Sequence, residues 1–182
     1  LLANMKGRRP KTRPEVYAEQ ARFIDDNPTE KLVLQTLRIG DLGITTLPNE
    51  VYSITGLKLK AHSPFSATFN IELANGAAGY IPPPHQHELG GYTTWPARTA
   101  GLEVSAEPKI VETLLSSLES LAGKPRRDPV PSHGAYAKAV LTEKPLAYWR
   151  CEEFEGGRLT DASGNDRPGK IEGVVAYHLP GP

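Results

Sequence analysis

The sequence of 182 residues lacks several features that define whole classes of protein. It holds one cysteine, Cys151, which excludes an intrachain disulfide framework and a paired-cysteine zinc motif. It has no run near the roughly 20 consecutive apolar residues that a membrane-spanning helix needs. Lys plus Arg and Asp plus Glu number 21 each, so no net charge draws the chain to nucleic acid or to an anionic membrane. We therefore expect neither a nucleic-acid partner nor a transmembrane segment.

Common catalytic and targeting motifs are missing as well. There is no glycine-rich phosphate loop and no serine nucleophile elbow, and Ser116 and Ser117 fall inside a predicted helix. The basic residues between Lys6 and Arg13 fit either a nucleic-acid-binding arm or a solvated tail. The first three residues are too few for the apolar part of a signal peptide. We interpret the chain as a piece of a longer polypeptide, so the missing signal does not favour the cytoplasm.

The pattern of apolar residues predicts a mixed α+β fragment, in which a hairpin and one further strand pack with two helices. The predicted elements are a helix at 15–24, a hairpin at 32–47, a helix that begins at Glu50 and ends before Ser63, a strand at 67–73, a long loop at 75–101, a helix at 107–122 capped by Gly123, and short strands with tight turns at 136–141, 145–150, 161–166 and 170–176. The segment 124–134, with three prolines among charges, is typical of a linker.

Two of these patterns also predict which side chains are buried. In the strand, the apolar residues alternate with polar ones, which is typical of a half-buried strand (Ala67, Phe69, Ile71, Leu73). In the helix after Asn49, a plausible N-cap, four apolar residues fall on one face (Val51, Ile54, Leu57, Ala61).

Two hard oxygen donors, Glu50 and Tyr80, each follow a strand-like run. Glu50 is a candidate metal ligand or general base, but a carboxylate at the start of a helix also complements the helix dipole. Tyr80 is a candidate phenolate ligand, an oxyanion donor or a half-buried loop aromatic. The pair His85 and His87 would share a face on a strand and could bind a metal there, whereas Pro82-Pro83-Pro84 favours an extended, solvated loop.

The order of motifs around these residues resembles the neutral/alkaline non-lysosomal ceramidase family over about residues 30–122. The segments that carry the resemblance are Leu37-Arg-Ile-Gly-Asp-Leu-Gly-Ile-Thr-Thr-Leu-Pro-Asn-Glu50, Leu73-Ala-Asn-Gly-Ala-Ala-Gly-Tyr80-Ile81 and Gly90-Gly-Tyr92. The resemblance implies that Glu50 and Tyr80 are two late ligands of a catalytic zinc ion and that Tyr92 lines the site near the scissile amide. It places two zinc-binding histidines and an active-site serine upstream of Leu1.

The resemblance departs from the family in three places. The helix after Glu50 begins Val-Tyr-Ser-Ile, the segment between the two motifs is shorter, and the loop after Tyr80 carries Pro-Pro-Pro-His-Gln-His. We therefore expect a hydrolase of a lipid or other N-acyl amide rather than of one fixed substrate.

The C-terminal part resembles the opening of a laminin-G/concanavalin-like jelly roll, through Pro145-Leu-Ala-Tyr-Trp-Arg-Cys-Glu-Glu and Asp161-Ala-Ser-Gly-Asn-Asp166. Such a sandwich needs about eight strands, and this chain supplies about three, which makes the jelly roll incomplete. Tyr148 and Trp149 would be either stacking surfaces for a carbohydrate or strand core. The expected domains are 1–123, a late part of a ceramidase-like domain, a linker at 124–134, and 135–182, the start of a laminin-G-like sandwich.

The resemblance implies a fragment of a zinc-dependent amide hydrolase of sphingolipid metabolism that is secreted, periplasmic or at the cell surface. With two of four zinc ligands, the chain should be inactive by itself. The alternatives are a carbohydrate- or protein-binding module, and an interaction protein with a hydrolase-like fold that does not catalyse.

Overall fold

The computed structural model of the chain describes residues 2–129, 134–173, 175 and 177. It divides into two compact units, Leu1–Arg127 and Asp128–Pro182, with a boundary that lies inside the expected linker 124–134. Helices and short strands are mixed in the described residues, so the predicted α+β class is confirmed.

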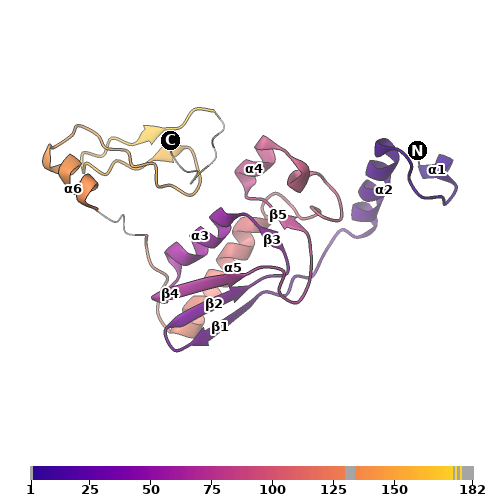
Figure 1. The fold of residues 1–182 in the computed structure, drawn as a ribbon, viewed down its shortest axis with the longest axis horizontal. Coiled ribbons are helices and arrows are strands. Elements are labelled where there is room, and N and C mark those ends of the chain that lie inside the picture. The colour runs from indigo at the N-terminus through magenta and orange to yellow at the C-terminus, as the bar shows by residue number, and fades with distance from the viewer. Residues whose placement is uncertain (1, 130–133, 174, 176, 178–182) are drawn as a thin grey trace. The chain divides into compact units, whose positions relative to one another are not determined.

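A three-stranded sheet organises the first unit (Figure 1). Strands β1 (Gln35–Ile39) and β2 (Leu42–Thr46) pair antiparallel around Gly40 and Asp41, which confirms the predicted hairpin. Strand β4 (Ala67–Ile71) pairs parallel to β2 on its other side. A parallel neighbour requires a crossover connection, and helix α3 (Ser53–His62) lies in that connection.

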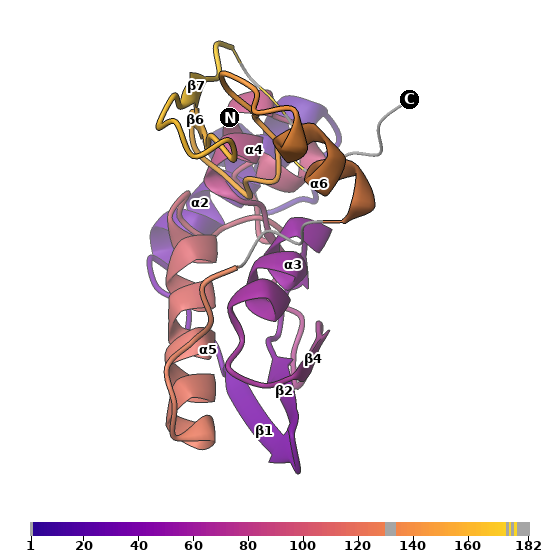
Figure 2. The same cartoon turned by 90° about the vertical axis from the view of Figure 1, so that its left-hand side faces the viewer.

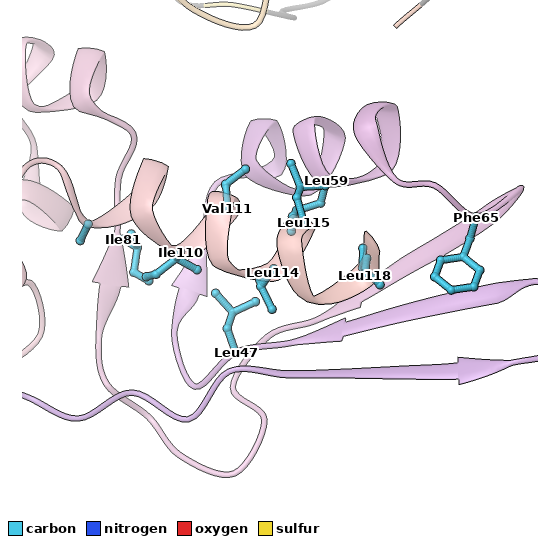
Figure 3. Packing of buried hydrophobic residues seen from close by; sticks show 10 residues of the cluster. Leu47, Leu59, Phe65, Ile81, Ile110, Val111, Leu114, Leu115 and Leu118 are labelled. Atoms are coloured by element: carbon cyan, nitrogen blue, oxygen red, sulfur yellow. The ribbon is translucent and has the colours of Figure 1, made fainter. Parts of the chain in front are cut away.

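Helices α3 and α5 (Ala106–Ala122) lie on one face of this sheet, as Figures 2 and 3 show. The apolar residues of α5 recur at helical spacing, and their side chains form most of the core cluster: Leu47, Leu59, Phe65, Ile81, Ala106, Ile110, Val111, Leu114, Leu115 and Leu118. Gly123 ends α5 in the left-handed conformation with φ 67°, as predicted. No helix in the described part of the chain is long and apolar enough to span a bilayer.

The sheet presents its polar side chains to the helices and its apolar ones to the opposite face. Thr36 Oγ1 lies 2.6 Å from Ser117 Oγ on α5, and Asn70 donates to the Gly56 carbonyl on α3. Phe69 and Ile71, on the other face of β4, are each 41% exposed. The predicted strand is present, but its apolar residues do not pack against these helices, because hydrogen bonds turn the polar residues toward them.

Helix α3 differs from the prediction in its start and in its buried face. It begins at Ser53, three residues after Glu50, and Leu57 is 39% exposed. The buried face carries Thr55 and Lys58, whose side chains reach the carboxylate of Glu107 on α5. Thr55 Oγ1 donates to Glu107 Oε1 at 2.9 Å, and Lys58 Nζ lies 3.2 Å from Oε2. A fully buried carboxylate needs such partners, which is why a lysine replaces an apolar residue on this face.

The remaining elements of the first unit flank this core. They are α1 (Leu2–Met5), α2 (Arg13–Asp26), β3 (Glu50–Val51), β5 (Tyr80–Ile81), α4 (Pro84–Leu89) and the 3-10 helix η1 (Tyr92–Thr94). The helix predicted at 15–24 is confirmed, since α2 contains it. The segment 75–101, predicted as an unstructured loop, instead contains three short elements.

The second unit contains a helix where the sequence predicted a strand. Residues 136–141 lie in α6 (Ala135–Thr142), because their apolar residues can also follow a helical period. Strands β6 (Arg158–Leu159) and β7 (Gly169–Lys170) pair antiparallel, and Trp149 forms an isolated bridge with Asp161. The end of the strand predicted at 170–176 falls partly outside the described residues.

The buried ion pair makes a prediction about stability. Lys58→Met should lower the free energy of unfolding by about 3–5 kcal/mol, because it leaves the Glu107 carboxylate buried without its charged partner. Lys60→Met, on the exposed side of the same helix, is the matched control and should change little. Lys58→Met/Glu107→Leu should recover much of the loss. Urea unfolding measures all three, and equal effects of the two lysine replacements would refute the assignment.

Candidate functional site

Two distant segments join edge to edge and create the candidate site. Residues 47–50 run beside residues 71–80, held by backbone hydrogen bonds from Leu47 N to the Ile71 carbonyl and from Glu50 N to the Gly79 carbonyl, at 3.1 and 3.0 Å. These bonds lead into the parallel pairing of β3 with β5, in which Glu50 stands opposite Tyr80. The pairing places the candidate carboxylate and phenol at adjacent positions.

The environment of Glu50 overturns the helix-start interpretation. Glu50 lies in β3 and not at the first position of a helix. Asn49 does not cap α3; it is fully buried, and its side-chain amide donates to the Ala78 carbonyl at 2.9 Å. Tyr52 holds the N-cap position without a side-chain cap. The Glu50 carboxylate therefore does not stand at the first position of α3, where it would complement the helix dipole.

Tyr92 completes a cluster with this pair. It begins η1, and its ring meets the ring of Tyr80 edge to face, with centroids 5.3 Å apart and an interplanar angle of 86°. The two hydroxyl groups share a long hydrogen bond of 3.4 Å. Glu50 and Tyr80 are half-buried, whereas Tyr92 is 63% exposed. All three residues singled out from the sequence thus lie together.

The pKa of Tyr80 is raised from 10.0 to about 12. The hydrogen bond with Tyr92 is the largest cause, partial burial follows, and a hydrogen bond with the Glu50 carboxylate and its negative charge add to it. The phenol is therefore protonated at neutral pH and stays so until strongly alkaline conditions. A nearby cation would reverse this effect, because positive charge stabilises the phenolate.

The donor set of this cluster is a carboxylate and two phenols. Hard oxygen ligands of this kind suit a divalent cation, and zinc sites accept carboxylate oxygen beside nitrogen. Within the residues that the structure describes, no group of three or more His, Cys, Asp or Glu is placed to hold a metal ion. The carboxylate and the two phenols could therefore supply only part of a coordination sphere.

The histidine pair does not adopt the geometry that a shared ligand site requires. His85 and His87 lie in α4, a short helix that begins at Pro84, so the predicted extended loop is wrong. Proline is well tolerated in the first turn of a helix, which explains how α4 begins here. Residues two apart on a helix point to different sides, whereas on a strand they share a face.

Two contacts near the cluster had no signal in the sequence. Tyr80 N donates to the Thr99 carbonyl at 2.7 Å, and the Tyr52 hydroxyl lies 2.7 Å from Thr93 Oγ1 beside Tyr92. Both join segments that only the folded chain brings together.

An open groove of about 450 Å³ adjoins the same region. It is lined by residues of β3, α3 and β4, including Val51, Leu57 and Lys60, together with Tyr52, which lies between β3 and α3, and Glu72, which follows β4. The Glu72 carboxylate accepts a hydrogen bond from Val51 N at 3.0 Å, next to Glu50 in the chain.

In the second unit, Trp149 is 47% exposed and Tyr148 is half-buried. The Trp149 indole N–H donates to the Arg167 carbonyl at 2.7 Å, which fixes the ring. Asp161 accepts hydrogen bonds from Tyr148 N, from the backbone and hydroxyl of Ser163 and from Arg167 N. These bonds hold its pKa below the ordinary range, so this carboxylate organises a turn.

Comparison of the chain with protein-family models, with curated proteins and with solved structures gives no match. The functional argument therefore rests on the site's geometry and on the motifs.

The approach of residues 79 and 99 generates a prediction about the site's backbone. A Cβ at Gly79, where φ is 78°, would lie 2.5 Å from the Thr99 carbonyl oxygen. Gly40→Ala is the control, since its φ is 60° and a Cβ there meets nothing within 4 Å. Gly40→Ala should cost about 1–2 kcal/mol for the left-handed backbone. Gly79→Ala should cost clearly more in urea unfolding; equal losses would mean that Thr99 does not crowd Gly79.

The tyrosine pair generates a prediction about ionisation. Tyr92→Phe and Glu50→Gln should each lower the pKa of Tyr80 from about 12 toward 10, whereas Glu88→Gln on the exposed side of α4 should not. Because the folded-state pKa is raised, the associated stability is present below pH 10 and is lost as the pH rises toward 12. NMR titration of ring-labelled tyrosine measures the pKa of Tyr80 directly. An unchanged Tyr80 midpoint in both variants would show that Tyr92 and Glu50 do not interact with the Tyr80 hydroxyl.

Proposed function

We propose that this chain contributes the late part of the active site of a zinc-dependent N-acyl amide hydrolase similar to the neutral ceramidases. One observation carries the proposal: the Glu50 carboxylate and the Tyr80 phenol, which the family resemblance marks as zinc ligands, stand opposite one another in the β3–β5 pairing.

The local structure around both residues supports the proposal. Strand β2 leads through Leu47-Pro48-Asn49 to Glu50 and then to helix α3, and β4 leads through a glycine-containing turn to Tyr80. This is the order of elements that the resemblance implies. Tyr92 lies beside Tyr80 and is open to solvent, which supports a contact with the scissile amide in this proposal.

Each residue has a chemical role in this proposal. Bound zinc would supply Lewis acidity toward the acyl carbonyl and would lower the pKa of water toward about 7. The Glu50 carboxylate balances the positive charge, and the Tyr80 oxygen either joins the ligand set after losing its proton or donates to the developing oxyanion. The exposed Tyr92 hydroxyl orients the amide. The substrate class is a lipid or another N-acyl amide.

The same proposal makes the isolated chain inactive. Glu50 and Tyr80 account for two ligands, and catalytic zinc sites normally have at least three protein ligands. In the proposal the other two are histidines of a longer polypeptide that carries this chain. Secretion or a periplasmic or cell-surface location belongs to the same proposal.

The test uses the complete polypeptide. Glu50→Gln should remove most of the bound zinc and of the zinc-dependent hydrolysis of a fluorogenic ceramide, because the site loses its anionic ligand. Glu72→Gln, a nearby carboxylate that bonds Val51 N, is the matched control and should retain zinc. Unchanged zinc content in Glu50→Gln would instead favour an interaction protein with a hydrolase-like fold that does not catalyse.

A second candidate function, carbohydrate binding by the C-terminal unit, is favoured by the exposed and fixed ring of Trp149. Exposed aromatic rings bury apolar area against a flat ligand at low conformational cost. Binding of the 182-residue chain to a glycan array should be lost in Trp149→Ala and kept in Trp95→Ala, an exposed tryptophan of the first unit. Equal binding by both variants, or none by the unaltered chain, would remove this candidate.

A further inference from the structure

The position of Tyr92 needs an explanation beyond packing. Its side chain is 63% exposed, so burial fixes it weakly. The two residues before η1, Gly90 and Gly91, have φ of 74° and 108°, and a Cβ at either would meet nothing within 4 Å. Glycine at two successive positions gives the chain wide conformational freedom just before Tyr92. The chain before Tyr92 therefore does not fix its position, so contacts of η1 with the rest of the fold contribute to it.

Tyr52 makes the shorter of the hydrogen bonds described above between η1 and its neighbours. Its hydroxyl lies 2.7 Å from Thr93 Oγ1, whereas the Tyr80 and Tyr92 hydroxyls are 3.4 Å apart. The bonds that Thr94 makes, from its N–H and its hydroxyl to the Gly91 carbonyl, stay within the segment. They shape η1 but do not place it against the rest of the fold.

The backbone of Tyr52 is fixed to the same strand that carries Glu50. Tyr52 follows β3 directly, and its carbonyl accepts a hydrogen bond from Thr55 N at 2.9 Å in the first turn of α3. A single residue, Val51, therefore separates Glu50, whose carboxylate approaches Tyr80, from Tyr52, whose hydroxyl is bonded to Thr93. The segment from Glu50 to Tyr52 therefore contacts both β5, which contains Tyr80, and η1, which begins at Tyr92.

We propose that Tyr52 is a positioning residue, whose hydroxyl, bonded to Thr93, sets Tyr92 against Tyr80 and Glu50. Its role in hydrolysis rests on the proposed function, but the placement of Tyr92 does not. The raised pKa of Tyr80 agrees with this arrangement, because the hydrogen bond with Tyr92 is its largest cause. The Tyr52 hydroxyl, through its bond to Thr93, would act on the site by way of the neighbouring Tyr92.

The experiment uses the 182-residue chain without metal. Tyr52→Phe removes only the hydroxyl, and Thr93→Val removes the other partner at nearly constant shape. Each should weaken the nuclear Overhauser effects between the Tyr80 and Tyr92 rings and shift the Tyr80 pKa downward. The double variant should add nothing further, since both replacements break one bond. Tyr136→Phe, an exposed residue of α6, is the control.

The outcomes separate this inference from the proposed function. Unchanged ring contacts and an unchanged Tyr80 pKa in both folded single variants would overturn the positioning role, whatever the zinc measurements give. Additive effects in the double variant would overturn it too. Lost ring contacts together with unchanged zinc in Glu50→Gln of the complete polypeptide would leave the positioning role standing and would sink the hydrolase proposal.

Discussion

A single buried carboxylate sets the arrangement of the first unit. Glu107 is completely inaccessible to solvent, and its oxygens are held by Thr55 and Lys58 of α3. An isolated buried charge is costly, so α3 must turn these two residues inward and must keep a fixed rotation against α5. The start of α3 is thereby fixed, and with it Tyr52 and the preceding strand β3. The contact of Glu107 with Thr55 and Lys58 therefore also fixes the position of Glu50, although Glu50 takes no part in it.

The candidate site depends on a second constraint, which is the hydrogen bonding of the main chain. Residues 47–50 and 71–80 are joined by main-chain hydrogen bonds, and Gly79 allows an approach to Thr99 that a side chain would prevent. Through this seam Glu50 and Tyr80 meet at a strand pairing of only two residues. Backbone pairing of the strands therefore holds Glu50 and Tyr80, whereas side-chain hydrogen bonds hold Tyr92 and its segment. Such a division suits a group that must be fixed beside one that contacts a substrate.

The sequence predicts where helices and strands lie better than it predicts which of their faces are buried. The hairpin and α5 have strong local patterns, and Gly123 is a recognisable cap, so these were correct. The start of α3 was misjudged because Asn49 resembles a cap, whereas its amide is used by the Ala78 carbonyl. The inward face of α3 could not be foreseen, since Lys58 is buried only by virtue of Glu107, far along the chain. The alternation in β4 likewise predicted that Phe69 is buried. The hydrogen bond from Asn70 to the Gly56 carbonyl instead turns Asn70 toward the helices and leaves Phe69 on the other face. The resemblance to the ceramidase family implied that Glu50, Tyr80 and Tyr92 lie together, whereas the bond between Tyr52 and Thr93 had no sequence signal.

Zinc titration of the complete polypeptide, followed by the ultraviolet absorbance of tyrosinate at neutral pH, tests the central claim most directly. Tyr80 is protonated without a cation, since its pKa is about 12. Stoichiometric zinc should therefore generate one equivalent of tyrosinate absorbance, and Tyr80→Phe should abolish this signal while Tyr92→Phe keeps it. Tight zinc binding with no tyrosinate signal, or the same signal in Tyr80→Phe, would contradict the assignment of Tyr80 as a ligand beside Glu50.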